Sequence, residues 1–146
     1  MKKEQILEFI NNNPTIYLAT LEGAEPRVRA MFLYKADESG ITFHTGPFKD
    51  VYKQIMSNPN VQMCFYNPEQ NIQVRVRGTL KNINDRALKD EIASHPSRQF
   101  MQGWKASCAT EDDFYNMFTV FRLTGGIANV WSFESNFAPK EDISLS

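Results

Sequence analysis

The stretch from Ile41 to Gly78 constrains the fold of this chain more than any other part of the sequence. Its start predicts a strand that runs into a Gly-Pro turn, and residues 50–57 predict a short helix that ends at Asn-Pro. Two strands follow, 61–66 and 72–81, and the second alternates apolar and polar residues without a break. Most connections between the strands expected along the chain are too short for parallel crossovers, so the pattern predicts an antiparallel sheet.

The remainder of the chain extends this pattern towards a closed sheet. Residues 97–118 show the weakest periodicity and are expected to be helical in part, whereas the polar tail, 136–146, is expected to be loosely held. About seven strands and three or four helices predict a mainly β (α+β) fold, an antiparallel barrel with helices packed outside it. The 146 residues fit a single domain, 1–146. The other expected helices are 3–12 and 85–95, and the other expected strands are 16–21, 27–36, 119–124 and 127–133.

The charge and the cysteine content of the chain argue against several function classes. A net charge of −1 argues against general nucleic-acid binding, which needs a basic face. Two cysteines and two histidines, at no metal-ligand spacing, predict neither a disulfide framework nor a metal site. The N-terminus has no apolar run long enough for a signal peptide or a membrane span. We therefore expect a cytoplasmic protein that binds neither nucleic acid nor membranes.

Lys49 and Lys53 lie one turn apart at the start of the predicted helix, directly after the Gly-Pro turn. The first backbone N–H groups of a helix have no partners within it, so they can bond an anion. An exposed helix face also carries lysines without any ligand, and this alternative stays open. The functional interpretation is a phosphorylated ligand that lies against the sheet.

Cations also gather on two of the predicted strands, one before the helix and one after it. Arg27 and Arg29 share a face of the first strand, and Gln73, Arg75 and Arg77 share the polar face of the second. Such residues are typical of a solvent-exposed sheet face. The functional alternative is a polar surface that hydrogen-bonds a flat ligand.

His44 is the one titratable residue that we consider as a catalytic candidate, because it lies two residues before the turn. A lone histidine more often makes a structural hydrogen bond. Trp131, near the C-terminus, is likewise more often a core residue than a surface on which a cofactor stacks. The residues alone therefore assign no catalytic group beyond the candidate His44.

At these residues the chain resembles the FMN-binding split-barrel family, the pyridoxamine 5'-phosphate oxidase-like proteins, and within it the nitroimidazole-resistance-like and general-stress-protein-like branch. Three segments carry the resemblance in family order: IYLATLEGAEPRVRAMF, ITFHTGPFKDVYKQIMSNPNV and IQVRVRGTL. The resemblance spans Ile16 to about Phe133. It implies a six-stranded antiparallel split barrel with flanking helices, which works as a homodimer with FMN at the subunit interface.

The resemblance also implies which residues hold the cofactor. The PRVRAMF strand would run along the flavin, partly through its backbone, and Lys49 would bind the phosphate, with Lys53 as a weaker second. Trp131 would cover the flavin from the partner chain. The implied cofactor-binding residues are Arg27, Val28, Arg29, Ala30, His44, Thr45, Lys49, Lys53, Gln73 and Trp131.

The chain departs from the true oxidases at two places. Their adjacent Arg-Lys pair at the phosphate is replaced here by Asp50 and Val51, and their C-terminal Arg and His cluster is replaced by a tail whose only cation is Lys140. We therefore expect an FMN-dependent oxidoreductase that transfers a hydride or electrons with a small molecule other than pyridoxamine phosphate. Two alternatives stay open: the same fold with a deazaflavin or haem, and a flavin-binding or sensing protein that is not a catalyst.

Overall fold

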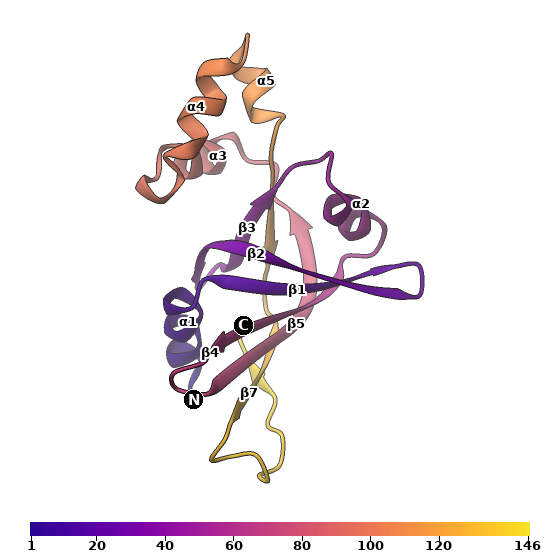
Figure 1. Cartoon of the computed structure of the whole chain (residues 1–146), viewed down its shortest axis with the longest axis vertical. Helices are drawn as coiled ribbons and strands as arrows, with labels where there is room; N and C mark the ends of the chain where they lie inside the picture. The colour runs from indigo at the N-terminus through magenta and orange to yellow at the C-terminus, as the bar shows by residue number, and fades with distance from the viewer.

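Six antiparallel strands close into a barrel in the computed structural model, which describes residues 1–146 (Figure 1). Around the barrel the strands follow the order β1-β2-β3-β6-β5-β4, and β4 pairs back with β1. Two further strands extend the sheet outside the barrel, because β7 pairs with β5 and β8 pairs with β7. The predicted split barrel is confirmed. The strands are β1 (Thr15–Glu22), β2 (Glu25–Asp37), β3 (Gly40–Thr45), β4 (Asn60–Asn67), β5 (Ile72–Asn82), β6 (Thr119–Leu123), β7 (Ile127–Ser132) and β8 (Ile143–Ser144).

The helices lie outside the barrel, and three of them form a lobe at one end of the molecule (Figure 1). This lobe consists of α3, a single 3-10 turn η1, α4 and α5. It interrupts the chain between β5 and β6, where the sequence pattern was weakest. None of the helices is both long and apolar enough to cross a membrane. The helices are α1 (Lys3–Asn12), α2 (Asp50–Ser57), α3 (Arg86–Ser94), η1 (Pro96–Arg98), α4 (Phe100–Ser107) and α5 (Glu111–Tyr115).

β5 has one buried face and joins the barrel to its extension. Val74, Val76 and Leu80 are buried, whereas Arg77 and Thr79 between them are exposed. Because β5 is long, its first part pairs with β4 and β7, and its end pairs with β6. β5 thus belongs both to the barrel and to the extension formed by β7 and β8, and the sheet branches at this strand.

Two separate apolar clusters stabilise the two parts of the molecule. The larger cluster fills the barrel and includes Ile6 and Ile10 from α1 and Val51 and Ile55 from α2. The smaller cluster holds the helical lobe together around Phe114. Each buried large apolar side chain contributes about 1.5–3 kcal/mol to stability. The barrel and the helical lobe are therefore each stabilised by a core of their own.

The C-terminal tail is attached to the sheet, and the prediction of a loosely held tail is wrong. β8 pairs with β7, and Leu145 is only 8% exposed. The Leu145 N–H donates to the carbonyl of Gly126 at 2.9 Å. Apolar residues alternate with serines at the end of the chain, and this short alternation is enough to add an edge strand.

Gly40 at the start of β3 provides a stability prediction. Its φ is +130°, and a Cβ there would lie 2.3 Å from the carbonyl oxygen of Leu123. We expect Gly40→Ala to lower the free energy of unfolding by about 3 kcal/mol or more. Gly23→Ala is the matched control, because Gly23 also has a positive φ, +61°, but nothing lies within 4 Å of a Cβ there.

The control should cost only about 1 kcal/mol, the strain of the left-handed backbone alone. Urea unfolding of both variants measures the difference. Equal losses would show that the contact with Leu123 is easily relieved, contrary to this account.

Candidate functional site

Two adjoining hollows lie where β2, the end of β3 and the start of α2 meet. The first, which we call the aromatic pocket, has a volume of about 420 Å³ and is mostly apolar. The second, the polar pocket, has a volume of about 490 Å³ and is lined mainly by charged and polar side chains. Ala30, Met31 and Lys49 line both pockets. The two hollows therefore form one continuous site with an apolar end and a polar end.

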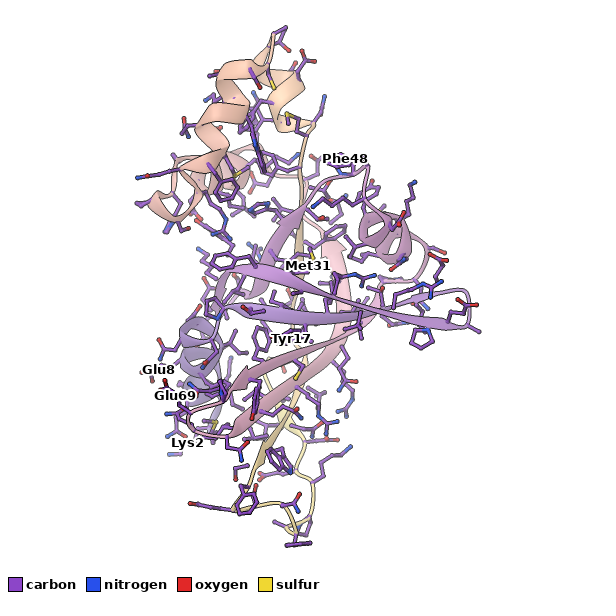
Figure 2. All side chains as sticks on the ribbon, in the orientation of Figure 1. Lys2, Glu8, Tyr17, Met31, Phe48 and Glu69 are labelled. Atoms are coloured by element: carbon purple, nitrogen blue, oxygen red, sulfur yellow. The ribbon has the colours of Figure 1, made fainter.

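The walls of the aromatic pocket come from the barrel and from the helical lobe. Phe32 on β2 and Phe48 on the loop before α2 line it from the barrel, and Trp104 of α4 and Phe118 line it from the lobe. Figure 2 shows Phe48 above β2, on which Met31 lies. The Phe48 ring folds back over Gly46, where a Cβ would lie 2.5 Å from the ring, so a larger residue there would displace the ring. Aromatic walls of this kind suit a flat ligand.

The start of α2 provides an anion site at the junction of the two pockets. Lys49 is the N-cap residue, and no side chain caps the helix there. The N–H groups of the first helical turn therefore keep their capacity to bond a ligand, and the helix dipole favours negative charge at this point. Lys49 adds a full positive charge, whereas Asp50 lines the same pocket and reduces it. The residues present fit an anionic group at this point, such as a phosphate.

Arg29 supports the site from inside the barrel. Its Nη1 donates to the carbonyl of Leu18 at 3.1 Å and to Thr20 Oγ1 at 2.7 Å, and its Nη2 donates to Gln54 Oε1. Gln54 lies on α2, so these bonds tie the helix to β1. Burial lowers the pKa of Arg29, and the carboxylate of Asp50 opposes this shift. The Arg29 side chain thus fixes the position of α2 and lines the polar pocket at the same time.

Arg27, Val28 and Ala30 lie along the outer edge of the same strand. Arg27 pairs with Glu25 at 2.8 Å and with Glu22 at 3.4 Å, and all three side chains are largely exposed. Exposed pairs of this kind contribute about 0–1 kcal/mol, so Arg27 remains free to reorient towards a ligand. Val28 lines the polar pocket, and Ala30 lines both pockets.

His44 and Thr45 form the floor of the aromatic pocket at the end of β3. His44 Nε2 accepts a hydrogen bond from the Nε of Arg98, which lies in η1, at 2.9 Å. Burial, and then the positive charges of Arg98 and Lys49, lower the pKa of His44 to about 4. His44 is therefore neutral at pH 7. The hydroxyl of Thr45 is buried and has no hydrogen-bond partner in the chain.

Three of the predicted cofactor residues lie away from this site within one chain. Lys53 is exposed on α2 and lines neither pocket. Gln73 and Trp131 are paired neighbours on β5 and β7, three and four strands away from β2 in the sheet. Trp131 lines another cavity of about 490 Å³, together with Arg75 and the C-terminal tail. One chain alone thus brings together seven of the ten predicted residues.

Sequence reasoning missed the aromatic residues that complete the pocket and the arginine behind it. Phe48 lies between Pro47 and Lys49, within the turn that was already predicted to hold a ligand. An aromatic residue at this position was the signal that could have identified it as part of the site. Trp104, Phe118 and Arg98 lie in the segment with weak periodicity, where no signal pointed to a site. Trp104 and Phe118 reach the pocket, and Arg98 reaches His44 behind it, only because the lobe packs against the barrel end.

The chain thus combines an antiparallel split barrel with an uncapped helix start beside an aromatic pocket. A family model described as pyridoxamine 5'-phosphate oxidase matches residues 3–124. The chain therefore belongs to the pyridoxamine 5'-phosphate oxidase family. The sequence-based resemblance to this family is confirmed.

Curated relatives agree with this assignment. The pyridoxine/pyridoxamine 5'-phosphate oxidase of Haemophilus ducreyi is 29% identical over 101 residues, which cover 69% of this chain and 48% of the relative. The protein of the same name from Brucella ovis is 30% identical over 95 residues, covering 64% of this chain and 46% of the relative. This chain spans about half the length of these curated relatives.

Solved structures share the fold over almost the whole chain. A NimC/NimA family protein from Clostridium acetobutylicum has a TM-score of 0.74 and 26% identity, covering 98% of this chain and 93% of that one. A protein related to general stress protein 26, from the same organism, has a TM-score of 0.73 at 14% identity, with 98% and 94% covered. An FMN-binding protein related to pyridoxamine 5'-phosphate oxidase, from Nostoc punctiforme, has a TM-score of 0.66 at 17% identity, with 98% and 95% covered. At these identities the last two show the fold alone.

Proposed function

We propose that this protein binds FMN across the two pockets and uses it to transfer a hydride or electrons to a small, flat acceptor. The observation that carries the proposal is the position of Lys49, at an uncapped helix start exactly where the aromatic and polar pockets join. FMN has a flat aromatic ring system at one end and a phosphate at the other. A site with an aromatic end and an anion-accepting junction matches both ends of this molecule.

Two details of the chain support FMN over a ligand without a phosphate or a ring. The Thr45 hydroxyl is buried without a partner beside the aromatic pocket, so a polar atom of the ligand would satisfy it. Lys49 and the free N–H groups of α2 would bind the phosphate. The name of the FMN-binding relative from Nostoc punctiforme points to the same cofactor.

A second copy of the chain completes the site in this proposal. Tyr17 on β1, with Val28 and Phe32 on β2, leaves an apolar patch on the outer face of the sheet, with exposed fractions of 48%, 71% and 57%. Gln73 and Trp131 lie on the same outer face, three and four strands away, roughly 14 and 19 Å along the sheet. Packing this face against itself across a two-fold axis would bring these two residues of one protomer towards β2 of the other.

The chain's own contribution to the reaction would be binding, orientation and exclusion of water. When bound, the flavin supplies the hydride or electron chemistry. Phe32, Phe48 and Trp104 would hold a flat acceptor against the flavin ring and keep water out. His44 is neutral at pH 7, so it acts as a hydrogen-bonding group and not as a cationic acid.

We expect the FMN-loaded protein not to oxidise pyridoxamine 5'-phosphate at a useful rate. A second phosphate beside FMN requires further free cations, since two phosphates held close together repel. Arg77 is already paired with Asp142 at 3.0 Å and donates to Asn129, and Lys140 is followed by an acidic residue. Apart from Lys49, which would bind the FMN phosphate, no lysine or arginine lines the aromatic pocket.

Parallel assays of the same FMN-loaded sample decide between the two kinds of substrate. In one, formation of pyridoxal 5'-phosphate is measured with dioxygen as the electron acceptor. In the other, the bound FMN is first reduced with dithionite, and its reoxidation by the quinone menadione or by a nitroaromatic compound is measured. The proposal expects turnover only in the second assay. Robust formation of pyridoxal 5'-phosphate would overturn this substrate assignment, and flavin binding without turnover of any acceptor would favour a flavin-binding or sensing role instead.

A further inference from the structure

Arg98 is a buried cation without a carboxylate partner, immediately behind the aromatic pocket. It lies in η1, at the junction of the helical lobe and the barrel, and is only 1% exposed. No acidic side chain forms an ion pair with it, since the eight ion pairs of the chain involve other residues. Burying a guanidinium this deeply without a counter-charge costs free energy. Its hydrogen bonds therefore contribute more to stability than those of an exposed arginine.

The guanidinium group is held in one orientation by contacts on all sides. Nη2 donates to the carbonyl of Leu33 at 2.9 Å, and Nη1 donates to Ser97 Oγ at 3.0 Å. The rings of Phe32 and Tyr34 lie 4.9 and 5.5 Å from its central carbon. The remaining polar contact is Nε, which donates to His44 Nε2 at 2.9 Å.

This last hydrogen bond fixes the tautomer of His44. An arginine Nε–H can only donate, so His44 Nε2 must accept, and the proton of the neutral ring must sit on Nδ1. Nδ1 itself makes no hydrogen bond to the chain, although His44 lines the aromatic pocket. Arg98 and Lys49 are the charged groups that act on the ring, and both are cations. The Phe118 ring packs against it edge-on, with 5.7 Å between ring centroids, so nothing in the chain favours a second proton.

We propose that Arg98 is a positioning residue that holds His44 as the neutral tautomer protonated on Nδ1, and that His44 offers this N–H to an oxygen atom of the ligand in the aromatic pocket. The ligand part rests on the proposed function. The oxygen atom belongs either to the flavin or to the carbonyl or nitro group of the acceptor. A fixed donor at this point would orient the ligand without transferring a proton at neutral pH.

Long-range ¹H–¹⁵N spectra of the flavin-free protein test the tautomer directly. The chain has only two histidines, so the His44→Gln variant identifies the signals. We expect the wild-type ring to carry its proton on Nδ1 from pH 8 down to about pH 5. A proton on Nε2, or an exchanging mixture like that of a free imidazole, would overturn the inference without the need for any further variant.

Two variants separate positioning from simple packing. Arg98→Met should release the ring into a mixture of tautomers and raise its titration midpoint by about one pH unit or more, because a donor and a positive charge are removed. Arg98→Leu, which also removes both the N–H donors and the charge, should give the same result and replaces the first variant if that one does not fold. Tyr34→Phe is the control: it keeps the ring over Arg98, removes only the hydrogen bond to Glu91, and should leave His44 unchanged. An unchanged tautomer in a folded Arg98 variant would contradict the proposal.

Stepwise addition of FMN and then menadione identifies the source of the oxygen atom. A change in the Nδ1–H signal on adding FMN assigns it to the flavin, and a change only with menadione assigns it to the acceptor. No change with either, while flavin is bound, would overturn the donor role. Failure of FMN to bind at all would overturn the proposed function. It would not affect the test of the tautomer, because the tautomer is measured in the flavin-free protein.

Discussion

Lys49→Ala is expected to weaken FMN binding about 10- to 100-fold while leaving riboflavin binding nearly unchanged. A charge-assisted hydrogen bond to a phosphate contributes about 1.5–3 kcal/mol, and each 1.4 kcal/mol corresponds to a factor of ten. Lys49 is the only lysine that lines both pockets, and it stands at the helix start where the phosphate would lie. Titration of the flavin-free protein with each flavin, followed by fluorescence quenching, gives both dissociation constants.

Lys53→Ala is the matched control for this experiment. Lys53 is on the same helix, one turn further, and has the same charge, but it is exposed and lines neither pocket. Its removal should change FMN affinity less than about threefold, which corresponds to the weak, screened interaction of an exposed charge. If both flavins lose affinity equally in Lys49→Ala, or if Lys53→Ala has the larger effect, the phosphate is not at the start of α2.

Tyr17→Asp is expected to dissociate the proposed homodimer and to release the flavin with it. Tyr17 lies in the middle of the outer face, opposite Ala30 on β2 and Cys64 on β4 (Figure 2). A carboxylate buried between two copies without a partner loses its hydration, so the dimer dissociation constant should rise by at least about 100-fold. The barrel itself should stay folded, because this side chain is half exposed and points away from the core. Sedimentation velocity of the two proteins at micromolar concentration measures the change.

The control for this variant is Met56→Asp, which places the same charge at an apolar residue, 53% exposed, on α2. It should leave the sedimentation coefficient unchanged. A wild-type protein that sediments as a monomer with flavin still bound would contradict the dimer, and would confine the site to one chain.

The bounds of a helix can be predicted well from the sequence where residues that end it lie next to it in the chain. Helices 3–12 and 50–57 have the expected bounds, because an Asn-Asn-Asn-Pro run and an Asn-Pro pair end them. The strand 72–81 was recognised from its alternation, and the structure extends it by one residue. His44 and Lys49 were considered as site residues for a similar reason, because they lie on either side of a single turn, whereas Thr45 was implied only by the family resemblance.

The remaining parts of the site depend on contacts between distant segments. Trp104 and Phe118 line the pocket only because the helical lobe packs on the barrel, and its short helices leave little periodicity to read. Arg98 was missed because arginines are mostly exposed, and no pattern in the sequence marks one that is buried. Gln73 and Trp131 were implied by family resemblance, but a single chain places them strands away from β2.

The absorption spectrum of the purified protein, followed by titration with FMN, tests the central claim most directly. We predict the two-band visible spectrum of an oxidised flavin, or its appearance on adding FMN, with about one FMN bound per chain. A deazaflavin or haem spectrum, or a colourless protein that FMN does not bind at micromolar concentration, would contradict the proposed site.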